Sequence, residues 1–299
     1  MINLVLTRRA AVISAIWLGP LAHAQKPLAL DADGVQMLLP PLAGGTVLSL
    51  GKQDPNVAPN MAFDYKIKAI QGKDSGVVFW TMPSVALDYS SGNQGYTARV
   101  HLRAPGAKQR YNWKTQQGYL SSPQDVRNQE FTVYLRVHEL LTPSIAQAAL
   151  KIRGGGHHAN DPDAGSCTMM TLAAATHKSV TRFGKELSHP QYDYVDLKPM
   201  LDAALRDNRW VGLKLLSWSH PKNPTQVVNQ LHIDTTAFDT AGKPANQWRL
   251  LSEYTDVEGK STGRYTKLVD WGALQTTLRV DGYRSMDFTH MSVREIMPP

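Results

Sequence analysis

The chain has 299 residues, of which 42% are hydrophobic and 19% are charged, and its formal net charge is +7. This length allows one large β domain or two small domains, and the hydrophobic share is sufficient for a packed core. The single cysteine, Cys167, excludes an intrachain disulfide, so stability must come from packing. A basic protein suits an acidic partner. The sequence contains no nucleic-acid recognition motif or basic helix, so we expect an acidic polysaccharide rather than nucleic acid.

Residues 1–24 are typical of a signal peptide. Thr7-Arg8-Arg9 provides a basic start, an apolar run extends from Ala10 to Leu21, and Ala22-His23-Ala24 fits a small-x-small cleavage site. The paired arginines also fit twin-arginine export. The apolar run is too short to span a bilayer and no later stretch approaches 18 apolar residues, so we expect no membrane span. The predicted mature protein begins near Gln25 and is periplasmic or secreted; the loss of two arginines lowers its charge from +7 to +5.

Residues 25–60 are rich in Pro and Gly and are predicted to form an extended N-terminal segment with one strand near 47–50. From residue 61 to 299, short apolar runs recur between turns rich in Gly, Pro, Asn and Asp, which predicts β-strands. A short helix is predicted over 197–207. The fold class that follows is all-β, a two-sheet jelly-roll sandwich with one or two short helices. The predicted strands of this carbohydrate-active domain are 61–68, 77–80, 96–103, 131–138, 149–153, 167–172, 210–218, 227–234, 248–257, 276–281 and 286–296.

The strand predicted at 131–138 has the clearest alternation in the chain. Its apolar residues recur at every second position, so they should face a core, and its polar residues should share the opposite face. A phenol, a guanidinium and an imidazole in one row can bind an anion and move a proton. The apolar set is Phe131, Val133, Leu135 and Val137, and the polar set is Thr132, Tyr134, Arg136 and His138.

Other strands carry a similar mixture of cationic, aromatic and amide side chains on one face. If these faces belong to one concave sheet, they line a single groove that would bind a sugar acid through charge, hydrogen bonds and ring stacking. If they are ordinary solvated surfaces, or are divided between two sheets, no groove forms. The further candidate substrate-binding residues are Arg99, His101, Arg103, Lys151, Arg153, Lys214 and Trp218, with Gln230 and His232 on another predicted strand.

These residue types fit the cleavage of a uronic acid polymer by β-elimination. That reaction requires a group that neutralises the carboxylate, a base for the C5 proton and an acid for the leaving oxygen. Arg136 and Gln230 fit the first role, His232 or His138 the second, and Tyr134 the third. A structural role for Gln230 and His232 is the alternative, because histidines are common in strands.

The chain resembles the concanavalin-like jelly-roll polysaccharide lyases, and in particular the alginate lyases. Gln230-Leu231-His232 is close to the Gln-Ile/Val-His strand of that family, and Arg136 is similar to the last arginine of its Arg-Ser/Thr-Glu-Leu/Val-Arg strand. The Ser-Glu positions and the Tyr-Phe-Lys-x-Gly strand of the family have no counterpart here. The closing segment at 286–296 is similar to the last strand of such jelly rolls. The resemblance implies an exported lyase that needs no redox cofactor.

Two other activities compete with this interpretation. A noncatalytic, lectin-like protein would use the same cationic surface for binding alone. A glycoside hydrolase would need paired carboxylates on one face. Glu253 and Asp256 fall on opposite faces of a strand, so hydrolysis is disfavoured.

The loop at 154–166 contains side chains that could contact a metal or the substrate. Asn160, Asp161 and Asp163 offer oxygen ligands for a structural calcium ion, although Asp-Pro-Asp is also ordinary turn chemistry. His157 and His158 would reach the substrate if the loop covers the groove. The following cysteine, Cys167, is expected to be a buried, inert thiol because it lies within a predicted strand.

Overall fold

The structure is a computed structural model, and it describes residues 29–88, 94–103, 126–154, 167–174, 180–188, 191–197, 204–260, 262–272 and 275–299. Two eight-stranded sheets pack against each other, and every strand pairing is antiparallel. The predicted two-sheet, all-β sandwich is therefore confirmed. The predicted signal peptide at 1–24 lies outside the described residues. The described residues include no helix with the length and hydrophobicity of a membrane span.

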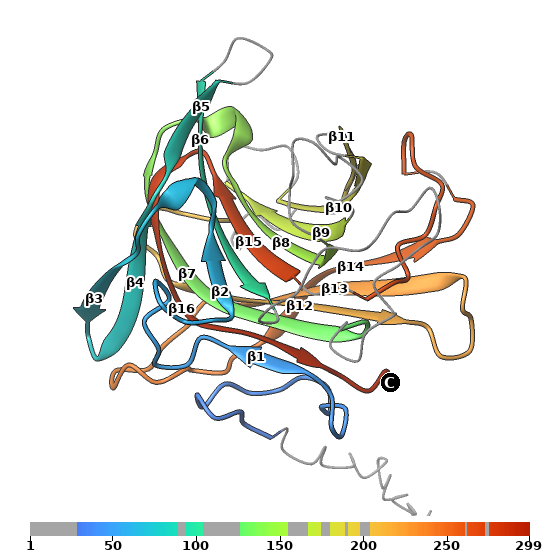
Figure 1. The fold of residues 1–299 in the computed structure, drawn as a ribbon, viewed down its shortest axis with the longest axis horizontal. Helices are drawn as coiled ribbons and strands as arrows, with labels where there is room; N and C mark the ends of the chain where they lie inside the picture. The colour runs from blue at the N-terminus through green and yellow to red at the C-terminus, as the bar shows by residue number, and fades with distance from the viewer. Residues whose placement is uncertain are drawn as a thin grey trace, which may run out of the picture.

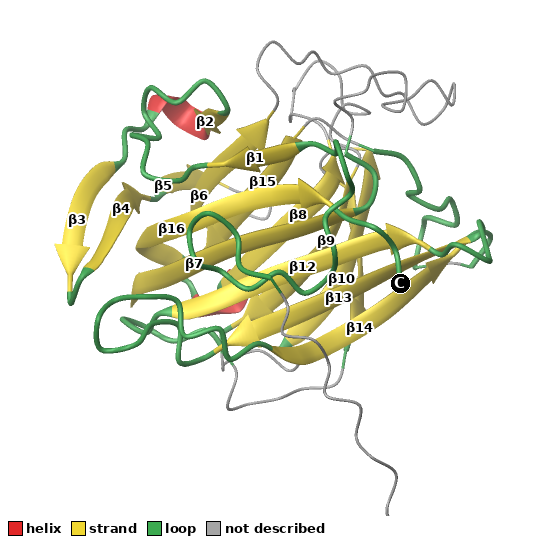
Figure 2. Cartoon of the chain, turned by 90° about the horizontal axis from the view of Figure 1, so that it is seen from below, coloured by secondary structure: helices red, strands yellow, loops and turns green. Residues whose placement is uncertain are grey.

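We call the two layers sheet I and sheet II, and both are visible in Figure 1. Sheet I has the order β14-β13-β12-β7-β16-β4-β3, with β1 also paired to β16. Its strands are β1 (Val47–Ser49), β3 (Ile70–Asp74), β4 (Val77–Pro83), β7 (Gln129–Leu140), β12 (Val211–Ser219), β13 (Gln226–Asp234), β14 (Arg249–Val257) and β16 (Tyr283–Glu295). Figure 2 shows the long strands of this sheet lying side by side in front of the second layer.

Sheet II has the order β11-β10-β9-β8-β15-β6-β2, with β5 also paired to β6. Its strands are β2 (Met61–Phe63), β5 (Val85–Asp88), β6 (Gln94–Arg103), β8 (Gln147–Gly154), β9 (Cys167–Ala173), β10 (Thr181–Ser188), β11 (Gln191–Asp196) and β15 (Gln275–Asp281). Figure 1 shows this sheet curving from β6 round to β11, so that its face away from sheet I is concave.

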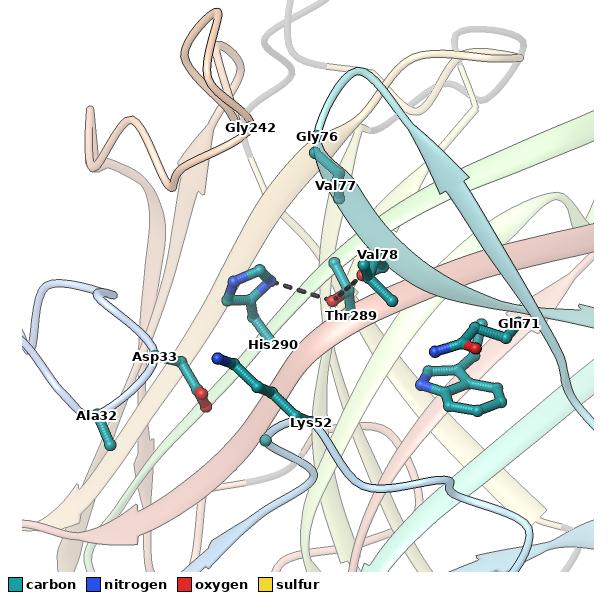
Figure 3. Close-up of a pocket in the computed structure, with 12 residues that line it drawn as sticks. Ala32, Asp33, Lys52, Gln71, Gly76, Val77, Val78, Gly242, Thr289 and His290 are labelled. Carbon is teal, nitrogen blue, oxygen red and sulfur yellow. Dashed lines mark hydrogen bonds between the residues drawn. The ribbon is translucent and has the colours of Figure 1, made fainter.

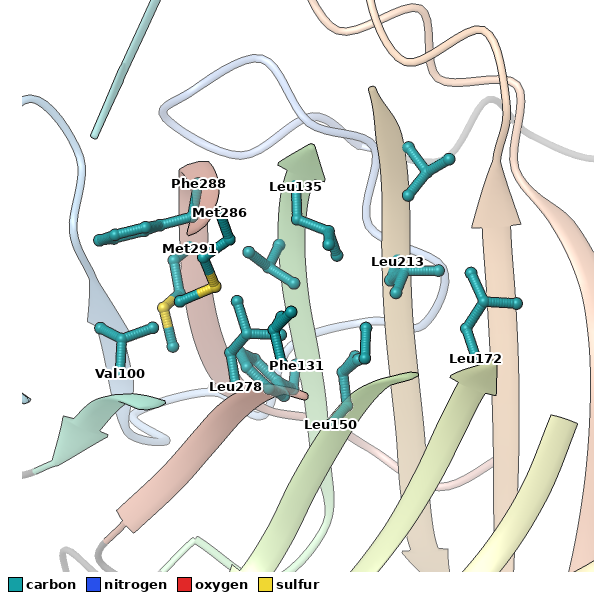
Figure 4. Packing of buried hydrophobic residues seen from close by; sticks show 14 of the residues in the cluster. Val100, Phe131, Leu135, Leu150, Leu172, Leu213, Leu278, Met286, Phe288 and Met291 are labelled. Carbon is teal, nitrogen blue, oxygen red and sulfur yellow. The ribbon is translucent and has the colours of Figure 1, made fainter. Parts of the chain in front are cut away.

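A single large hydrophobic core fills the space between the sheets. Alternate residues of each strand enter it, as the period of a β-strand requires. The predicted apolar set of β7, Phe131, Val133, Leu135 and Val137, is fully buried in this core. Figure 4 shows Phe131 and Leu135 in the same cluster as Leu150, Leu172 and Leu278 of sheet II.

Some predicted elements differ from the observed ones. The predicted helix at 197–207 is wrong for the part that is described, because Leu205 and Asp207 form isolated β-bridges with Ala174 and Val137. The strand predicted at 61–68 ends at Phe63, where a 3-10 turn (Asp64–Lys66) begins. A second such turn spans Pro143–Ile145. Four observed strands were not predicted: β3, β5, β10 and β11.

The N-terminal segment covers part of sheet I through buried polar contacts. The carboxylate of Glu130 accepts hydrogen bonds from Lys214 Nζ at 2.7 Å and from the backbone N–H of Leu38 at 2.9 Å. Lys214 Nζ also donates to Thr132 Oγ1 at 2.7 Å. Both members of the ion pair are fully buried. Lys214, predicted to bind substrate, is therefore inaccessible to a ligand in this structure and has a structural partner instead.

Replacing Lys214 with Met tests how much the Lys214–Glu130 ion pair contributes to the free energy of unfolding. The change keeps the length of the side chain but leaves the Glu130 carboxylate buried without its counter-charge, so we expect a loss of roughly 3–5 kcal/mol in unfolding free energy. Urea titration of the purified protein measures this free energy of unfolding. Lys222, which is exposed in a turn, is the matched control, and Lys222→Met should change the unfolding free energy by less than about 0.5 kcal/mol. Equal stability of the two variants would contradict a structural role for the pair.

Candidate functional site

The predicted site residues are divided between the two outer faces of the sandwich. The alternate residues of β7, β12 and β13 that do not enter the core lie on the outer face of sheet I, and those of β6 and β8 lie on the outer face of sheet II. Because packed sheets are about 10 Å apart with a filled core between them, the two faces cannot meet. The single groove expected from the sequence is therefore not formed. Sheet I carries Tyr134, Arg136, His138, Lys214, Trp218, Gln230 and His232, and sheet II carries Arg99, His101, Arg103 and Lys151.

Tyr134 is fully buried beneath aromatic side chains. Its ring lies 4.9 Å from the ring of Phe238, 5.6 Å from Trp248 and 5.5 Å from His290. Its hydroxyl is shielded from solvent and makes no hydrogen bond with a described residue. Burial raises the pKa of this phenol, and the nearby carboxylates of Asp234 and Asp31 raise it further. The acid role predicted for Tyr134 has no access to a polymer in this arrangement.

Arg136 and His138 are held by acidic neighbours. Arg136 donates to Asp287 at 2.8 Å and to Asp74 at 3.0 Å, and its guanidinium lies over the ring of Trp210 at 4.8 Å. His138 Nε2 lies 2.8 Å from the same Asp287 oxygen. Two carboxylates already neutralise the charge of Arg136, so little of it remains to bind a sugar acid.

Gln230 and His232 form a small hydrogen-bonded group of their own. Gln230 Nε2 donates to Glu253 at 2.6 Å, and His232 Nε2 lies 3.1 Å from Gln230 Oε1. Burial and, to a smaller extent, the charge of Lys214 lower the pKa of His232 to about 4, against the opposing effect of Glu130. The imidazole is therefore neutral at neutral pH.

The two predicted bases, His138 and His232, lie far apart along the outer face of sheet I. His232 is in register with Lys214, and Lys214 with Thr132 of β7. His138 lies six residues further along β7, which corresponds to roughly 20 Å. The structure therefore places His138 and His232 on the same face but at different positions along it.

Two further predicted binding residues are buried. Arg153 is fully enclosed, with Nε donating to Ser217 Oγ at 3.0 Å and a terminal nitrogen donating to the backbone oxygen of Trp271 at 3.2 Å. Trp218 packs with Leu216 and Val228 in a satellite cluster. Neither side chain is exposed to a ligand, so the structure assigns both to packing.

On the outer face of sheet II, cationic and phenolic side chains from four strands converge. We call this group the tyrosine cluster, and it consists of Lys151 (β8), Arg182 (β10), Tyr192 and Tyr194 (β11) and Arg279 (β15). The two tyrosine rings are stacked, with centroids 5.9 Å apart and planes inclined by 10°. They lie over Ala149, Cys167 and Met169, which form the small apolar floor beneath them.

A glycine makes room for this arrangement. Gly184 of β10 is in register with Tyr194, and a Cβ atom at this position would lie 3.0 Å from the Tyr194 ring and 2.8 Å from Met169 Cγ. The absence of a side chain lets the ring lie across the sheet. The local sequence therefore positions the tyrosines inward over the face instead of towards solvent.

The hydroxyl of Tyr192 lies between two cations. Lys151 Nζ donates to it at 3.2 Å and Arg279 NH1 donates to it at 3.4 Å. Burial raises the pKa of Tyr192 above its ordinary value, while the charges of Lys151 and Arg279 oppose this shift. The phenol is therefore protonated at rest, with its oxygen surrounded by groups that would stabilise a negative charge.

The three cations of the cluster differ in how far they are neutralised. Lys151 pairs with the buried carboxylate of Glu186 at 2.9 Å, and Arg279 pairs with Asp281 at 2.8 Å. Arg182 donates to the amide oxygen of Gln147 at 2.5 Å and lies over the Tyr194 ring at 4.6 Å, but it has no carboxylate partner among the described residues. The cluster therefore presents one uncompensated, half-buried guanidinium next to the tyrosines.

A second polar group lies on the same face, towards β6. His101 Nδ1 lies 2.8 Å from Thr277 Oγ1, and His101 Nε2 lies 2.9 Å from Asp64, which also accepts from Arg99 at 3.2 Å. Hydrogen bonds with His101 and the charges of His101 and Arg99 outweigh burial and lower the pKa of Asp64 to about 2. Thr277 is in register with both His101 and Lys151, so this group adjoins the tyrosine cluster.

The remaining predictions concern the metal loop and the thiol. His157, His158, Asn160, Asp161 and Asp163 lie outside the described residues, so their suggested roles stay predictions. The described ranges contain no group of three or more side chains suited to hold a metal ion. Cys167 is buried, and burial raises the pKa of its thiol to about 12, so it is protonated at neutral pH.

Sequence reasoning missed Tyr192, Tyr194, Arg182 and Arg279. A signal for the tyrosines was present, because Gln191-Tyr192-Asp193-Tyr194-Val195 places two phenols two residues apart, which is the period of a strand. The segment is short and carries acidic residues, so it did not stand out as a strand.

No protein-family model matches this sequence, and no curated protein matches it either. Three solved structures are similar to it in fold. The endo-β-1,4-glucuronan lyase of the fungus Trichoderma reesei has a TM-score of 0.45 and 12% identity, covering 84% of this chain and 94% of that one. The alginate lyase of Aplysia kurodai has a TM-score of 0.44 and 11% identity, covering 85% and 98%. Lectin I-B4 of Griffonia simplicifolia has a TM-score of 0.35 and 10% identity, covering 83% and 98%. These neighbours are concanavalin-like jelly rolls that include both lyases and lectins, so the similarity in fold does not distinguish cleavage from binding.

Proposed function

We propose that this protein is an exported polysaccharide lyase that cleaves a uronic acid polymer by β-elimination on the outer face of sheet II. The observation that carries the proposal is the position of Tyr192, whose hydroxyl accepts hydrogen bonds from Lys151 and Arg279. Export rests on the signal-peptide pattern of residues 1–24, which directs the chain to the periplasm or the exterior.

The first requirement of the reaction is neutralisation of the substrate carboxylate. Arg182 supports this role because its guanidinium is half-buried and lacks a carboxylate partner among the described residues. A planar guanidinium can bind a carboxylate through two parallel hydrogen bonds. Withdrawal of charge from the carboxylate makes the neighbouring C5 proton more acidic.

The second requirement is the transfer of a proton. A base takes the proton from C5, the C4=C5 double bond forms, and the C4–O4 bond breaks as O4 gains a proton. Tyr192 in its phenolate form accepts the C5 proton, with Lys151 and Arg279 stabilising the phenolate. The resulting phenol then donates a proton to O4. One oxygen atom carries the proton between the two positions, and the reaction balances without an oxidant or reductant.

A noncatalytic lectin is the second candidate, because the charges of Lys151 and Arg279 are already paired with Glu186 and Asp281. A surface of this kind can hold an acidic polymer without reacting with it. Incubation with glucuronan, alginate, pectate and glycosaminoglycans separates the two functions. A lyase produces unsaturated ends that absorb in the ultraviolet, whereas a lectin binds with no gain in absorbance.

Tyr192→Phe is the direct test of the proton carrier. The ring and its packing remain while the hydroxyl is lost, so we expect turnover to fall by about 10²–10⁴-fold, with polymer binding retained. The rate of formation of unsaturated ends and calorimetric binding measure the two effects. Tyr254→Phe is the matched control, because Tyr254 stacks on Phe183 at 4.3 Å, away from the cluster, and its turnover should be unchanged.

His232→Ala distinguishes the two faces of the sandwich. His232 lies on sheet I, so this variant should keep its turnover if the reaction occurs at the tyrosine cluster. Loss of turnover in His232→Ala together with normal turnover in Tyr192→Phe would place the reaction on sheet I and contradict the assignment.

The pH dependence follows from the raised pKa of Tyr192. Only the phenolate can accept the C5 proton, and below the pKa its fraction rises tenfold for each pH unit. Because burial moves this pKa above its ordinary value of 10.0, we expect kcat/KM to increase with pH from about pH 6 to about pH 9. Initial rates in a series of buffers at constant ionic strength measure this. A profile that is flat or falls above neutral pH would contradict Tyr192 as the base.

A further inference from the structure

The edge of β16 in sheet I is paired with two different strands, and a gap remains between them. β4 pairs with β16 up to Phe288, which is opposite Trp80, and β1 pairs with β16 from Ser292 onward. Residues 289 and 290 of β16 have no backbone partner on this edge within the described chain, whereas the backbone oxygen of Met291 accepts from the N–H of Leu50 at 2.8 Å. The register with β7 shifts in the same interval, and His290 has a φ of 49°. A non-glycine residue in this left-handed region is strained, and such strain is concentrated at functional positions.

A cavity of about 510 Å³ occupies this gap. Its volume falls within the range of pockets that hold small molecules. The walls come from the N-terminal segment, the loop after β1, the β3–β4 hairpin and β16. Figure 3 shows Asp33, Lys52 and His290 gathered on one side of the pocket and Gln71 on the other. None of the five members of the tyrosine cluster lines it.

The polar side chains of the pocket have unused hydrogen-bonding capacity. The side chains of Lys52 and Gln71 make no hydrogen bond or ion pair with a described residue. His290 uses Nδ1 towards Thr289 Oγ1 at 3.1 Å, which leaves Nε2 available. Asp33 uses one oxygen to accept from Ser49 Oγ at 3.1 Å, which leaves the other. A carboxylate, an imidazole, an amide and an ammonium therefore remain for a ligand.

The imidazole in the pocket is suited to neutral hydrogen bonding. Burial lowers the pKa of His290, although the carboxylates of Asp33 and Asp31 oppose this shift. At neutral pH the ring is uncharged, so its free nitrogen can exchange a hydrogen bond with a hydroxyl. Lys52 is then the cation that lines the cavity.

We infer that this pocket is a second carbohydrate-binding site, which holds a single uronic acid unit at a position separate from the tyrosine cluster. Lys52 binds the carboxylate of the sugar, and Asp33, Gln71 and His290 bind its hydroxyls. Trp80 and Val78 supply the apolar surface that packs against the C–H groups of a sugar ring. The choice of an acidic sugar rests on the proposed function. The site would keep the polymer or a released end attached while the other face acts.

The test measures binding of sodium glucuronate and of glucose by isothermal titration calorimetry or ligand-observed NMR. The wild-type protein should bind glucuronate saturably in this pocket. Lys52→Met should weaken glucuronate binding about tenfold and leave glucose binding unchanged, because only the charge contact is lost. Val78→Phe should abolish binding of both sugars, since the larger ring fills the cavity while Val78 is 45% exposed and tolerates the change.

One control locates the binding. Lys222→Met makes the same charge change at a remote, exposed turn and should bind glucuronate like the wild type. Absence of glucuronate binding to the wild type, or normal binding by Val78→Phe, would each overturn the inference. If the wild type releases no unsaturated ends but loses glucuronate binding on Val78→Phe, the lyase proposal fails and the pocket stands as a sugar site.

Discussion

Burial of one apolar face of each sheet against the other is the interaction on which the rest of this structure depends. The strand β7 shows it most directly, because Phe131, Val133, Leu135 and Val137 all enter the core and none is exposed. Since successive side chains alternate, this burial forces every second residue outward. The two polar faces therefore lie back to back with the core between them, and residues from both cannot join in one site.

The two outer faces differ in how much of their surface is packed or paired, because different chain segments cover them. On sheet I, the N-terminal segment binds Glu130, and Phe238 and Trp248 cover Tyr134, so much of the face is packed or paired. On sheet II, the small residues Ala149 and Gly184 leave space in which two tyrosine rings lie among cations. We therefore expect the reaction to occur on sheet II, which offers both space and a cation without a carboxylate partner among the described residues.

The sequence predicted much of the fold and only part of the site. Alternation in 131–138 identified both the core residues of β7 and its polar face, because period two defines which side of a strand each residue occupies. It does not define which sheet a strand joins. Arg99 and His101 therefore looked equivalent to Arg136 and His138, although hydrogen-bond pairing places β6 and β7 in opposite layers. Tyr192 was missed because a six-residue edge strand with two acidic residues has a weak apolar signal.

The carboxylate partners of a cationic side chain, more than its residue type, decide whether it can bind an acidic substrate. Arg136 and Arg182 are both partly buried arginines that lie over aromatic rings, and residue type alone does not distinguish them. Arg136 is held between Asp74 and Asp287, which already supply the two carboxylates that its guanidinium can bind. Arg182 donates a hydrogen bond to the neutral amide of Gln147 and has no carboxylate partner among the described residues, so a substrate carboxylate would be its first anionic partner. Desolvating a guanidinium without a counter-charge is costly, and this cost falls when an acidic sugar binds. Lys52 is exposed and has no described partner, so its charge is available to a ligand, whereas the buried Lys214 is satisfied by Glu130.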